Sequence, residues 1–359
     1  ETMRQSRVRK LREQLEKSNV QAVLITNAVN RRYLTGFTGS SGYVVITPDR
    51  AVLLTDFRYR EQAPKEAPDF EVIEHGPDIY ASVKEILEAG NIERAGFEQE
   101  DVSYERYEQL TEKVDRVEWV PLNRVVSQIR LKKDEEEVNI LREACELADR
   151  AYEHILVYLK PGTSERDIAL ELEFFMRKNG AASSSFDTIV ASGERSSFPH
   201  GTASDRIMQS GELVTLDFGA YYKGYCSDIT RTVMIGDPQP KHREIYEIVL
   251  EAQMNALQHI KPGMTGREAD MLAREIIKEH GYDEYFGHGT GHGIGMEIHE
   301  GPRLSPRSED ILEPGMVVTV EPGIYIPGFG GVRIEDDILI TETGVELLTH
   351  AEKNFTILR

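Results

Sequence analysis

The chain has 359 residues, of which 40% are hydrophobic and 29% are charged, a composition typical of globular proteins. Its 42 Lys and Arg residues stand against 62 Asp and Glu residues, so the formal net charge is −20. Such an acidic surface repels phosphate backbones and anionic lipids, which excludes nucleic acids and membrane surfaces as expected partners. No apolar run approaches the ~20 residues of a membrane-spanning helix.

The length predicts two domains or one large one, since domains typically contain roughly 100–200 residues. The basic N-terminal stretch is not followed by the apolar segment of a signal peptide. Two cysteines, Cys145 and Cys226, are too few for a disulfide framework and fit a reducing compartment. We therefore expect a cytoplasmic protein.

The N-terminal part alternates helix-like and strand-like segments. Val8, Leu11 and Leu15 share one face of a helix expected over residues 8–17. Short buried strands are expected at 21–26, 43–46 and 51–55, and further helices near 79–89 and 104–114. This alternation predicts an α/β domain over residues 3–131.

A second domain is expected over residues 132–359. Asp134 and Glu137 have the spacing of a helix capping box, and apolar residues at helical spacing follow until Pro161-Gly162 ends the run. The boundary is therefore placed near residues 131–134.

The second domain contains an internal duplication. Lys160-Pro-Gly and Lys261-Pro-Gly open ungapped segments of equal length, each typical of a capped amphipathic helix that ends at a glycine. Phe198-Pro-His-Gly-Thr is repeated as Phe286-Gly-His-Gly-Thr. Two copies are too few for a solenoid and favour a closed α+β domain with pseudo-two-fold symmetry and a central site.

Each copy of the duplicated hairpin contributes two acids within apolar strands, Asp217 and Asp228 in the first and Glu321 and Glu335 in the second. One such acid alone is usually a solvated hairpin residue, but four bare charges in matched positions would be very costly to bury. Oxygen-rich sites suit Mn²⁺ or Co²⁺, and four carboxylates can bridge two ions. The pattern therefore favours a metal centre.

A histidine-rich and glycine-rich segment, HGTGHGIGMEIHE, carries His288, His292 and His299. Its glycines indicate a backbone close to other groups and make a regular helix unfavourable, and the common His-Glu-x-x-His metalloprotease motif is absent. His200 belongs to the duplicated Phe-x-His-Gly-Thr motif.

Together these residues resemble the proline-specific metallopeptidases of the pita-bread fold, Xaa-Pro dipeptidase (prolidase) and Xaa-Pro aminopeptidase (aminopeptidase P). The resemblance extends over nearly the whole chain, because RRYLTGFTG at 31–39 and TDFRY at 55–59 match the N-terminal domain of the creatinase/prolidase type. It implies an α/β N-terminal domain followed by a pita-bread catalytic domain. It also implies a homodimer, with the loop at 36–42 a candidate to reach the partner's active site.

The resemblance implies five ligands for two divalent ions, with Mn²⁺ favoured and Co²⁺ or Zn²⁺ as alternatives. The ligands are Asp217, Asp228, His292, Glu321 and Glu335, of which Asp228 and Glu335 would bridge. His200, His288 and His299 match histidines around the substrate, and Arg333 matches an arginine that supports the carboxylates.

The expected chemistry is hydrolysis of the Xaa-Pro bond by a metal-bridging hydroxide. Glu321 is suited to pass a proton from the water to the leaving proline nitrogen, and His288 and His299 to stabilise the oxyanion. The proline pocket is expected to be apolar; its candidate walls are Phe186, Phe198 and Tyr221.

Whether dipeptides or longer peptides are the substrate is left open by the sequence. Arg303 would clamp a C-terminal carboxylate, which slightly favours a dipeptidase, but a solvated loop arginine is an equal alternative and Arg307 is nearby. Methionine aminopeptidase usually lacks such an N-terminal domain, and creatinase-like enzymes do not need the five ligands. A non-catalytic peptide-binding module of the same fold is a remote alternative.

Overall fold

The computed structural model describes residues 1–359, and the chain divides into two compact units, Glu1–Arg130 and Leu131–Arg359. Each unit has its own β-sheets and its own hydrophobic core. None of the helices combines the length and the apolar character needed to cross a lipid bilayer.

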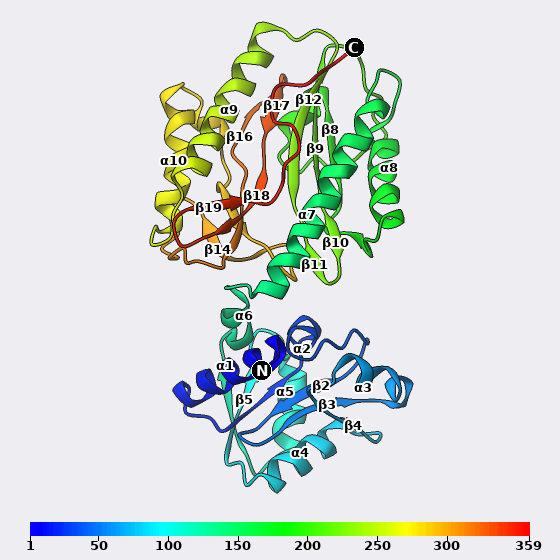
Figure 1. The fold of residues 1–359 in the computed structure, drawn as a ribbon, viewed down its shortest axis with the longest axis vertical. Coiled ribbons are helices and arrows are strands. Elements are labelled where there is room, and N and C mark those ends of the chain that lie inside the picture. The colour runs from blue at the N-terminus through cyan, green and yellow to red at the C-terminus, as the bar shows by residue number, and fades with distance from the viewer. The chain divides into compact units, whose positions relative to one another are not determined.

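A six-stranded mixed sheet forms the centre of the N-terminal unit, in the order β4-β3-β2-β1-β5-β6 (Figure 1). The strands are β1 (Ala22–Ile25), β2 (Tyr43–Ile46), β3 (Ala51–Thr55), β4 (Glu71–Glu74), β5 (Arg94–Glu98) and β6 (Glu118–Leu122). The helices are α1 (Met3–Lys17), α2 (Ala28–Thr35), α3 (Gln62–Glu66), α4 (Ile79–Ala89), α5 (Tyr104–Lys113) and α6 (Val125–Arg130), with a short 3₁₀ helix η1 (Phe57–Tyr59). Helices and strands alternate, as the sequence pattern predicts.

The first helix begins earlier than the predicted 8–17 because of its cap. The Thr2 side chain accepts from the Gln5 backbone N–H, and the Gln5 side chain accepts from the Thr2 N–H, which together form a capping box. The apolar periodicity that predicts the helix begins only at Val8, so a capped polar turn precedes the part that the periodicity detects.

The C-terminal unit is built from two similar halves. The first half contains α7 (Glu135–Ile155), η2 (Leu156–Tyr158), α8 (Glu165–Lys178), β7 (Ser183–Ser184), β8 (Ile189–Ser192), η3 (Gly193–Ser197), β9 (Glu212–Phe218), β10 (Ala220–Tyr222), β11 (Tyr225–Cys226) and β12 (Ile229–Ile235). The second contains α9 (Pro240–His259), α10 (Gly266–Glu279), η4 (Asp283–Tyr285), β13 (Gly291–Gly293), β14 (Glu300–Leu304), β15 (Val317–Val320), β16 (Gly323–Ile326), β17 (Gly330–Arg333), β18 (Asp336–Ile340), β19 (Val345–Leu347) and β20 (Ile357–Leu358).

The strands of this unit form four sheets, with orders β11-β10-β7, β20-β12-β9-β8, β14-β13-β15-β18-β19 and β16-β17. In Figure 1 helices α7 and α8 lie against one half and α9 and α10 against the other. The hairpin β9–β12 and the hairpin β15–β18 are both antiparallel. These two hairpins occupy the centre of the unit.

The duplication extends to individual backbone hydrogen bonds. The Gly162 N–H donates to Met208 O at 2.9 Å, and at the matching place Gly263 donates to Leu312 O at 2.8 Å. Both glycines have left-handed backbone, with φ of 95° and 93°. The Lys-Pro-Gly segments therefore make the same turn in each half.

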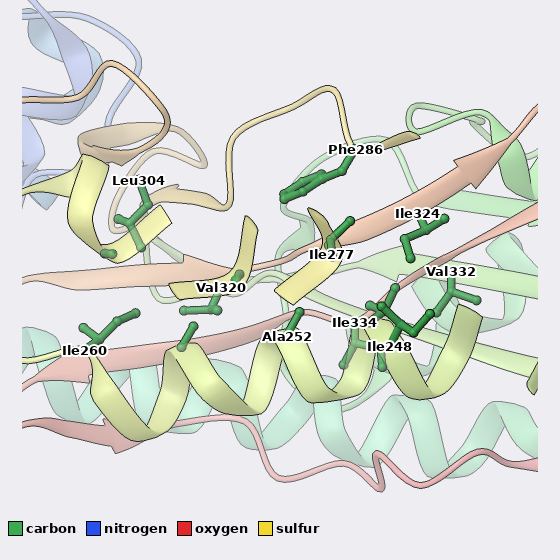
Figure 2. Close-up of a cluster of buried hydrophobic side chains, with 14 of the residues drawn as sticks. Ile248, Ala252, Ile260, Ile277, Phe286, Leu304, Val320, Ile324, Val332 and Ile334 are labelled. Carbon is green, nitrogen blue, oxygen red and sulfur yellow. The ribbon is translucent and has the colours of Figure 1, made fainter. Parts of the chain in front are cut away.

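The larger core cluster packs the second half's helices against its strands (Figure 2). Ile248 and Ala252 of α9 and Ile277 of α10 lie in the same cluster as Val320 of β15 and Ile334, which lies between β17 and β18. All five side chains are buried. The packing of this layer holds the strand ends that carry the acids.

Replacing Ile277 with Ala tests this packing. Ile277 is fully buried, so the free energy of unfolding should fall by about 2–5 kcal/mol because the change leaves a cavity. Urea unfolding monitored by circular dichroism measures the loss. Leu170→Ala on α8 is the control: Leu170 is 56% exposed, so its removal should change stability by less than about 1 kcal/mol. Equal losses in the two variants would contradict the role assigned to the core.

Candidate metal centre

Acidic side chains from both halves of the C-terminal unit meet at the ends of the duplicated hairpins. Asp228 immediately precedes β12, Glu335 immediately precedes β18, Glu321 immediately follows β15, and His292 lies in the middle of β13. One possible ligand atom from each of these four residues lies within 4.8 Å of the other three. The group is compact enough to hold a metal ion.

The strand register explains why these residues converge. Asp217 of β9 is paired with Thr230 of β12, and Val320 of β15 is paired with Asp336 of β18. An isolated antiparallel bridge between Thr230 and Glu335 connects the two hairpins. Thr230 Oγ1 also donates to Glu335 Oε1 at 2.6 Å. The bridge therefore places the acidic ends of both hairpins at one point.

Three of the predicted ligands have a buried carboxylate oxygen that no protein group hydrogen-bonds. These atoms are Asp217 Oδ1, Asp228 Oδ1 and Glu335 Oε2. An unpaired buried charge is costly, and a divalent cation is the usual partner for such oxygens. Carboxylates combined with one imidazole suit borderline ions such as Mn²⁺, Co²⁺ and Zn²⁺. The residues therefore fit a divalent metal site.

The charges at the site strongly perturb one another. Burial raises the pKa of Asp217 and the pKa of Glu335, and the neighbouring Asp228 and Glu321 raise both further. Burial also acts to raise the pKa of Glu321, but hydrogen bonds with Glu335 and His292 outweigh it and lower that pKa. The pKa of Glu321 is therefore shifted in the opposite direction from the pKa values of Asp217 and Glu335.

His292 is oriented as a ligand. Its Nδ1 lies 2.9 Å from Gly293 O, and because a carbonyl only accepts, Nδ1 carries the proton. Nε2 then faces Asp228 Oδ2 at 3.4 Å and Glu321 Oε2 at 3.5 Å. Burial acts to lower the pKa of His292, but hydrogen bonds to these two acids raise it. A backbone acceptor on the second nitrogen is typical of metal-binding histidines.

A chain of hydrogen bonds runs from Asp217 to His288. Arg333 donates to Asp217 Oδ2 at 2.8 Å and to the Tyr325 hydroxyl at 2.9 Å. The Tyr325 hydroxyl lies 2.6 Å from His288 Nε2, and His288 Nδ1 lies 2.7 Å from Gly289 O. Burial lowers the pKa of His288, so the neutral ring donates through Nδ1 and accepts from Tyr325. Both ring nitrogens of His288 therefore have protein partners.

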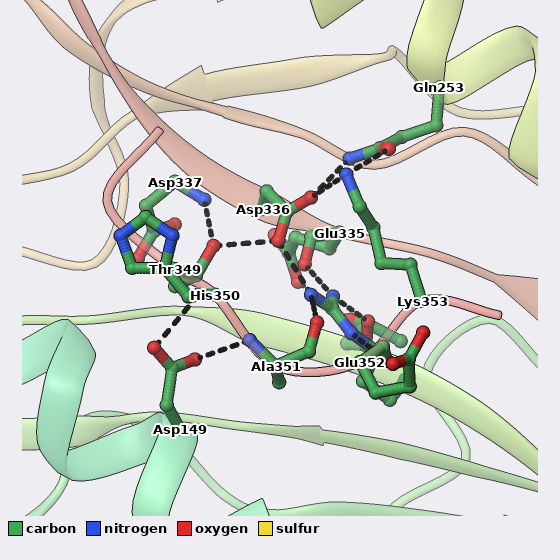
Figure 3. A network of polar contacts seen from close by, with 12 residues as sticks. Asp149, Gln253, Glu335, Asp336, Asp337, Thr349, His350, Ala351, Glu352 and Lys353 are labelled. Carbon is green, nitrogen blue, oxygen red and sulfur yellow. Dashed lines mark hydrogen bonds and ion pairs between the residues drawn. The ribbon is translucent and has the colours of Figure 1, made fainter. Parts of the chain in front are cut away.

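A buried network of polar contacts supports the backbone around Glu335 (Figure 3). Arg231 donates to Glu335 O at 2.7 Å and pairs with Asp336 Oδ1 at 2.7 Å. Lys353 pairs with Asp336 Oδ2 at 2.8 Å, and Arg231 also donates to Ala351 O at 2.9 Å. The segment near the C-terminus thus holds the backbone of a predicted ligand.

Asp337 supports a second predicted ligand. Its Oδ2 accepts from the Asp228 backbone N–H at 3.0 Å and from Cys145 Sγ at 3.3 Å. Burial raises the pKa of Asp337. Cys145 on α7 is therefore joined to the site through one carboxylate.

A cavity of about 240 Å³ opens onto the cluster. Its lining includes most of the predicted site residues. These lining residues are Pro199, His200, Asp217, His288, Gly289, Gly291, His292, His299, Arg303, Ser305, Glu321 and Arg333. His200, His299 and Arg303 are exposed side chains of this lining, whereas Asp217, His292 and Arg333 are buried.

The three aromatic side chains expected at the proline pocket do not line this cavity. Phe186 lines a neighbouring hollow beside α8, together with Thr188 and Thr202. Phe198 is exposed, and Tyr221 pairs with Ser183 and Cys226 in a separate small sheet. Tyr325, the counterpart of Tyr221 in the duplication, does contact the site through its hydroxyl, and the Phe286 ring packs against His288.

Two family models match the chain. The model described as metallopeptidase family M24 matches residues 139–342, and the creatinase/prolidase N-terminal domain matches residues 7–132. The first of these covers more than half of the chain.

The chain belongs to metallopeptidase family M24.

Similar proteins span its whole length. A solved structure described as Xaa-Pro dipeptidase from Bacillus anthracis is 52% identical, with a TM-score of 0.97, and covers 99% of this chain and 100% of that one. The X-Pro aminopeptidase of Thermotoga maritima is 41% identical, with a TM-score of 0.92 and coverage of 96% and 100%. The Xaa-Pro dipeptidase of Pyrococcus furiosus is 44% identical over 97% of this chain and 98% of the relative.

The predicted family, the two-part fold with a pita-bread C-terminal unit, and the prediction of a metallopeptidase are thereby confirmed. Membership of the M24 family, together with the cluster of Asp228, His292, Glu321 and Glu335, supports the use of a divalent metal.

Sequence reasoning missed Tyr325, Arg231 and Asp337 as parts of the site. Tyr325 carried a signal, because it repeats Tyr221 in the duplicated hairpin. Asp336 and Asp337 directly follow Glu335, and three consecutive acids in an apolar strand are unusual enough to indicate buried partners. Arg231 carried no such signal, since its role depends on carbonyls more than a hundred residues away.

The pKa shifts predict a stronger pH dependence of stability for the metal-free protein than for the metal-loaded protein. The raised pKa values of Asp217, Glu335 and His292 mean that the metal-free folded state binds more protons than the unfolded state. The contribution of these three groups to the stability of the chelated protein should therefore increase as pH falls from about 8 toward 5, opposed in part by His288 and His299, whose pKa values burial lowers. Excess Mn²⁺ should stabilise the protein by about 2.7 kcal/mol at a hundredfold excess over Kd and weaken the effect of pH.

Thermal unfolding with EDTA or with Mn²⁺, across this pH range, measures both effects. Asp228→Asn is expected to abolish the stabilisation by Mn²⁺. Asp205→Asn is the control, because Asp205 is an exposed residue outside the site. Identical pH slopes with and without metal would argue against these acids as ligands.

Proposed function

We propose that this chain is a metal-dependent Xaa-Pro dipeptidase. The observation that carries the proposal is the convergence of Asp228, His292, Glu321 and Glu335 beside a small cavity with Arg303 at its edge. The names of the similar Bacillus anthracis and Pyrococcus furiosus proteins support the Xaa-Pro specificity. Similarity to the Thermotoga maritima X-Pro aminopeptidase keeps longer peptides as the alternative substrate.

Two divalent ions, Mn²⁺ by preference, are proposed to be held by Asp217, Asp228, His292, Glu321 and Glu335. When bound they would lower the pKa of a shared water and polarise the scissile carbonyl. The three buried unpaired carboxylate oxygens support this set, and Arg333 holds Asp217 so that its other oxygen stays available.

Glu321 is proposed as the group that takes the proton of the attacking water and passes it to the proline nitrogen. It lines the cavity and is only half-buried, so its carboxylate can reach both a bound water and the leaving nitrogen, and its lowered pKa keeps it ionised before the reaction starts. His200 and His299 are assigned to the substrate carbonyl and the developing oxyanion, because both lie exposed in the cavity lining. His288 is assigned to the hydrogen-bond chain through Tyr325 and Arg333 to Asp217.

A cytoplasmic homodimer completes the proposal. Both cysteines are buried free thiols, as expected in a reducing compartment. The loop at 36–42 is a preformed surface, because Arg31 donates to Gly39 O and to Gly42 O, each at 2.7 Å. A rigid surface loop suits a role at a subunit contact, which is the role that the family resemblance implies.

Hydrolysis of Ala-Pro and of Ala-Pro-Ala, each with Mn²⁺ and with EDTA, tests the function. We expect metal-dependent release of proline from Ala-Pro and slower cleavage of the tripeptide. Faster cleavage of Ala-Pro-Ala would make the protein an aminopeptidase. Absence of both activities together with absence of Mn²⁺ uptake would favour a non-catalytic peptide-binding module.

Arg303→Met tests the carboxylate clamp. Loss of a charged hydrogen bond, worth about 1.5–3 kcal/mol, should raise KM for Ala-Pro by about 10-fold to 100-fold and leave the tripeptide nearly unaffected. Arg307→Met is the matched control, because Arg307 is exposed just after the strand that carries Arg303 but does not line the cavity. An unchanged KM in Arg303→Met would show that Arg303 is a solvated surface residue that does not bind the substrate carboxylate.

A further inference from the structure

The two histidines of the duplicated Phe-x-His-Gly-Thr motif are each held by a buried carboxylate and an arginine. We propose that the pair Glu165–Arg195 positions His200 and that the pair Asp270–Arg274 positions His288. The inference rests on the proposed function for its activity readout. These four are positioning residues, since none of them lines the catalytic cavity.

Glu165 hydrogen-bonds to both ends of the segment that carries His200. It is the first residue of α8, and its side chain is fully buried. It accepts from Ser192 N at 2.7 Å and Oγ at 2.6 Å, before His200, and from Ser204 N at 3.0 Å and Oγ at 2.5 Å, after it. One carboxylate therefore holds both ends of the segment from Ser192 to Ser204.

Arg195 extends this hold to the residues next to the histidine. Its guanidinium pairs with Glu165 and donates to Thr202 O at 2.8 Å. Thr202 lies two residues beyond His200 in the motif. No protein group hydrogen-bonds the His200 ring, so its place in the cavity lining depends on this backbone. Loss of the clamp should let the ring move while its surroundings remain folded.

Asp270 and Arg274 do the same for His288. Asp270 is fully buried on α10 and accepts from Thr290 N at 3.1 Å and from Thr290 Oγ1 at 2.8 Å. Arg274 binds both oxygens of Asp270, at 2.7 and 3.0 Å, and donates to His288 O at 2.7 Å and to Phe286 O at 2.9 Å. The backbone on both sides of His288 is thus fixed from one helix.

The two clamps occupy different positions in the two halves. Glu165 begins α8 and its arginine lies in η3, whereas Asp270 and Arg274 are four residues apart within α10. A pair inherited from the duplicated sequence would occupy equivalent positions. Buried ion pairs add little net stability compared with apolar packing, so the core does not need them. The two ion pairs share one feature: each hydrogen-bonds to the backbone on both sides of one histidine of the duplicated motif.

Double-mutant cycles on Ala-Pro hydrolysis test the assignment. Glu165→Gln should lower kcat/KM by about tenfold or more, because small displacements of catalytic groups have large effects. In a His200→Ala background the same change should lower it less than about twofold. In a His288→Ala background the tenfold loss should remain, and Asp270→Asn should show the reverse dependence.

Two controls separate positioning from general damage, and a second variant replaces the first if it does not fold. Asp205→Asn, beside Ser204 in an exposed ion pair, should leave kcat/KM unchanged. Mn²⁺ content should stay at the wild-type value in Glu165→Gln. If Glu165→Gln does not fold, Arg195→Lys, which keeps the charge but shortens the reach to Thr202, carries the same cycle.

Equal losses from Glu165→Gln in the His200→Ala and the parent backgrounds would overturn the proposal. Hydrogen exchange distinguishes this from failure of the proposed function, because it needs no activity. Glu165→Gln should speed amide exchange within residues 193–203 and leave residues 286–290 unchanged. Unchanged exchange at 193–203 would also overturn it, whereas an inactive wild type with the expected exchange pattern would overturn only the dipeptidase assignment.

Discussion

Four carboxylates and one imidazole lie where two β-hairpins meet, and the mutual repulsion of these buried acids is the constraint that the catalytic unit must satisfy. Arg333 compensates Asp217, Arg231 and Lys353 compensate the adjacent Asp336, and Asp337 holds the backbone of Asp228. These contacts leave one buried oxygen unpaired on each of three predicted ligands. These carboxylate oxygens therefore remain free to accept a cation, while hydrogen bonds hold the residues that carry them in place. A divalent metal site requires both.

The rigidity comes from supports that approach the hairpins from different directions. The segment Thr349–Lys353 binds Arg231 and Asp336 from one side, and α7 contributes Cys145. The helices α8 and α10 instead reach the histidine loops through buried carboxylates. Helices that cover the sheets thus also hold the loops at the cavity, so folding and the geometry of the site are linked.

Pseudo-two-fold symmetry places matching acids together without making the two halves chemically equal. Asp217 is bonded to an arginine, whereas its counterpart Glu321 faces His292 and has a lowered pKa. Tyr325 belongs to the hydrogen-bond chain of the site, whereas its counterpart Tyr221 pairs in a separate small sheet. The duplication explains why matching residues of the two halves meet at the site. The differences between the two copies give the residues of each half different roles in the proposed hydrolysis.

The sequence by itself determined the α/β and α+β organisation, the duplication and the four candidate acids, because periodicity, capping and repeated motifs are local. The strands at 43–46 and 51–55 and the helix at 79–89 were predictable for the same reason. The resemblance to a known family added the pita-bread fold and His292 as a fifth ligand. Only the tertiary structure decided which aromatic residue reaches the cavity, that Arg231 supports Glu335, and that Glu165 and Asp270 hold the histidine loops. Those contacts join residues far apart in the chain, and they depend on how the helices, loops and sheets pack together, which local sequence patterns do not show.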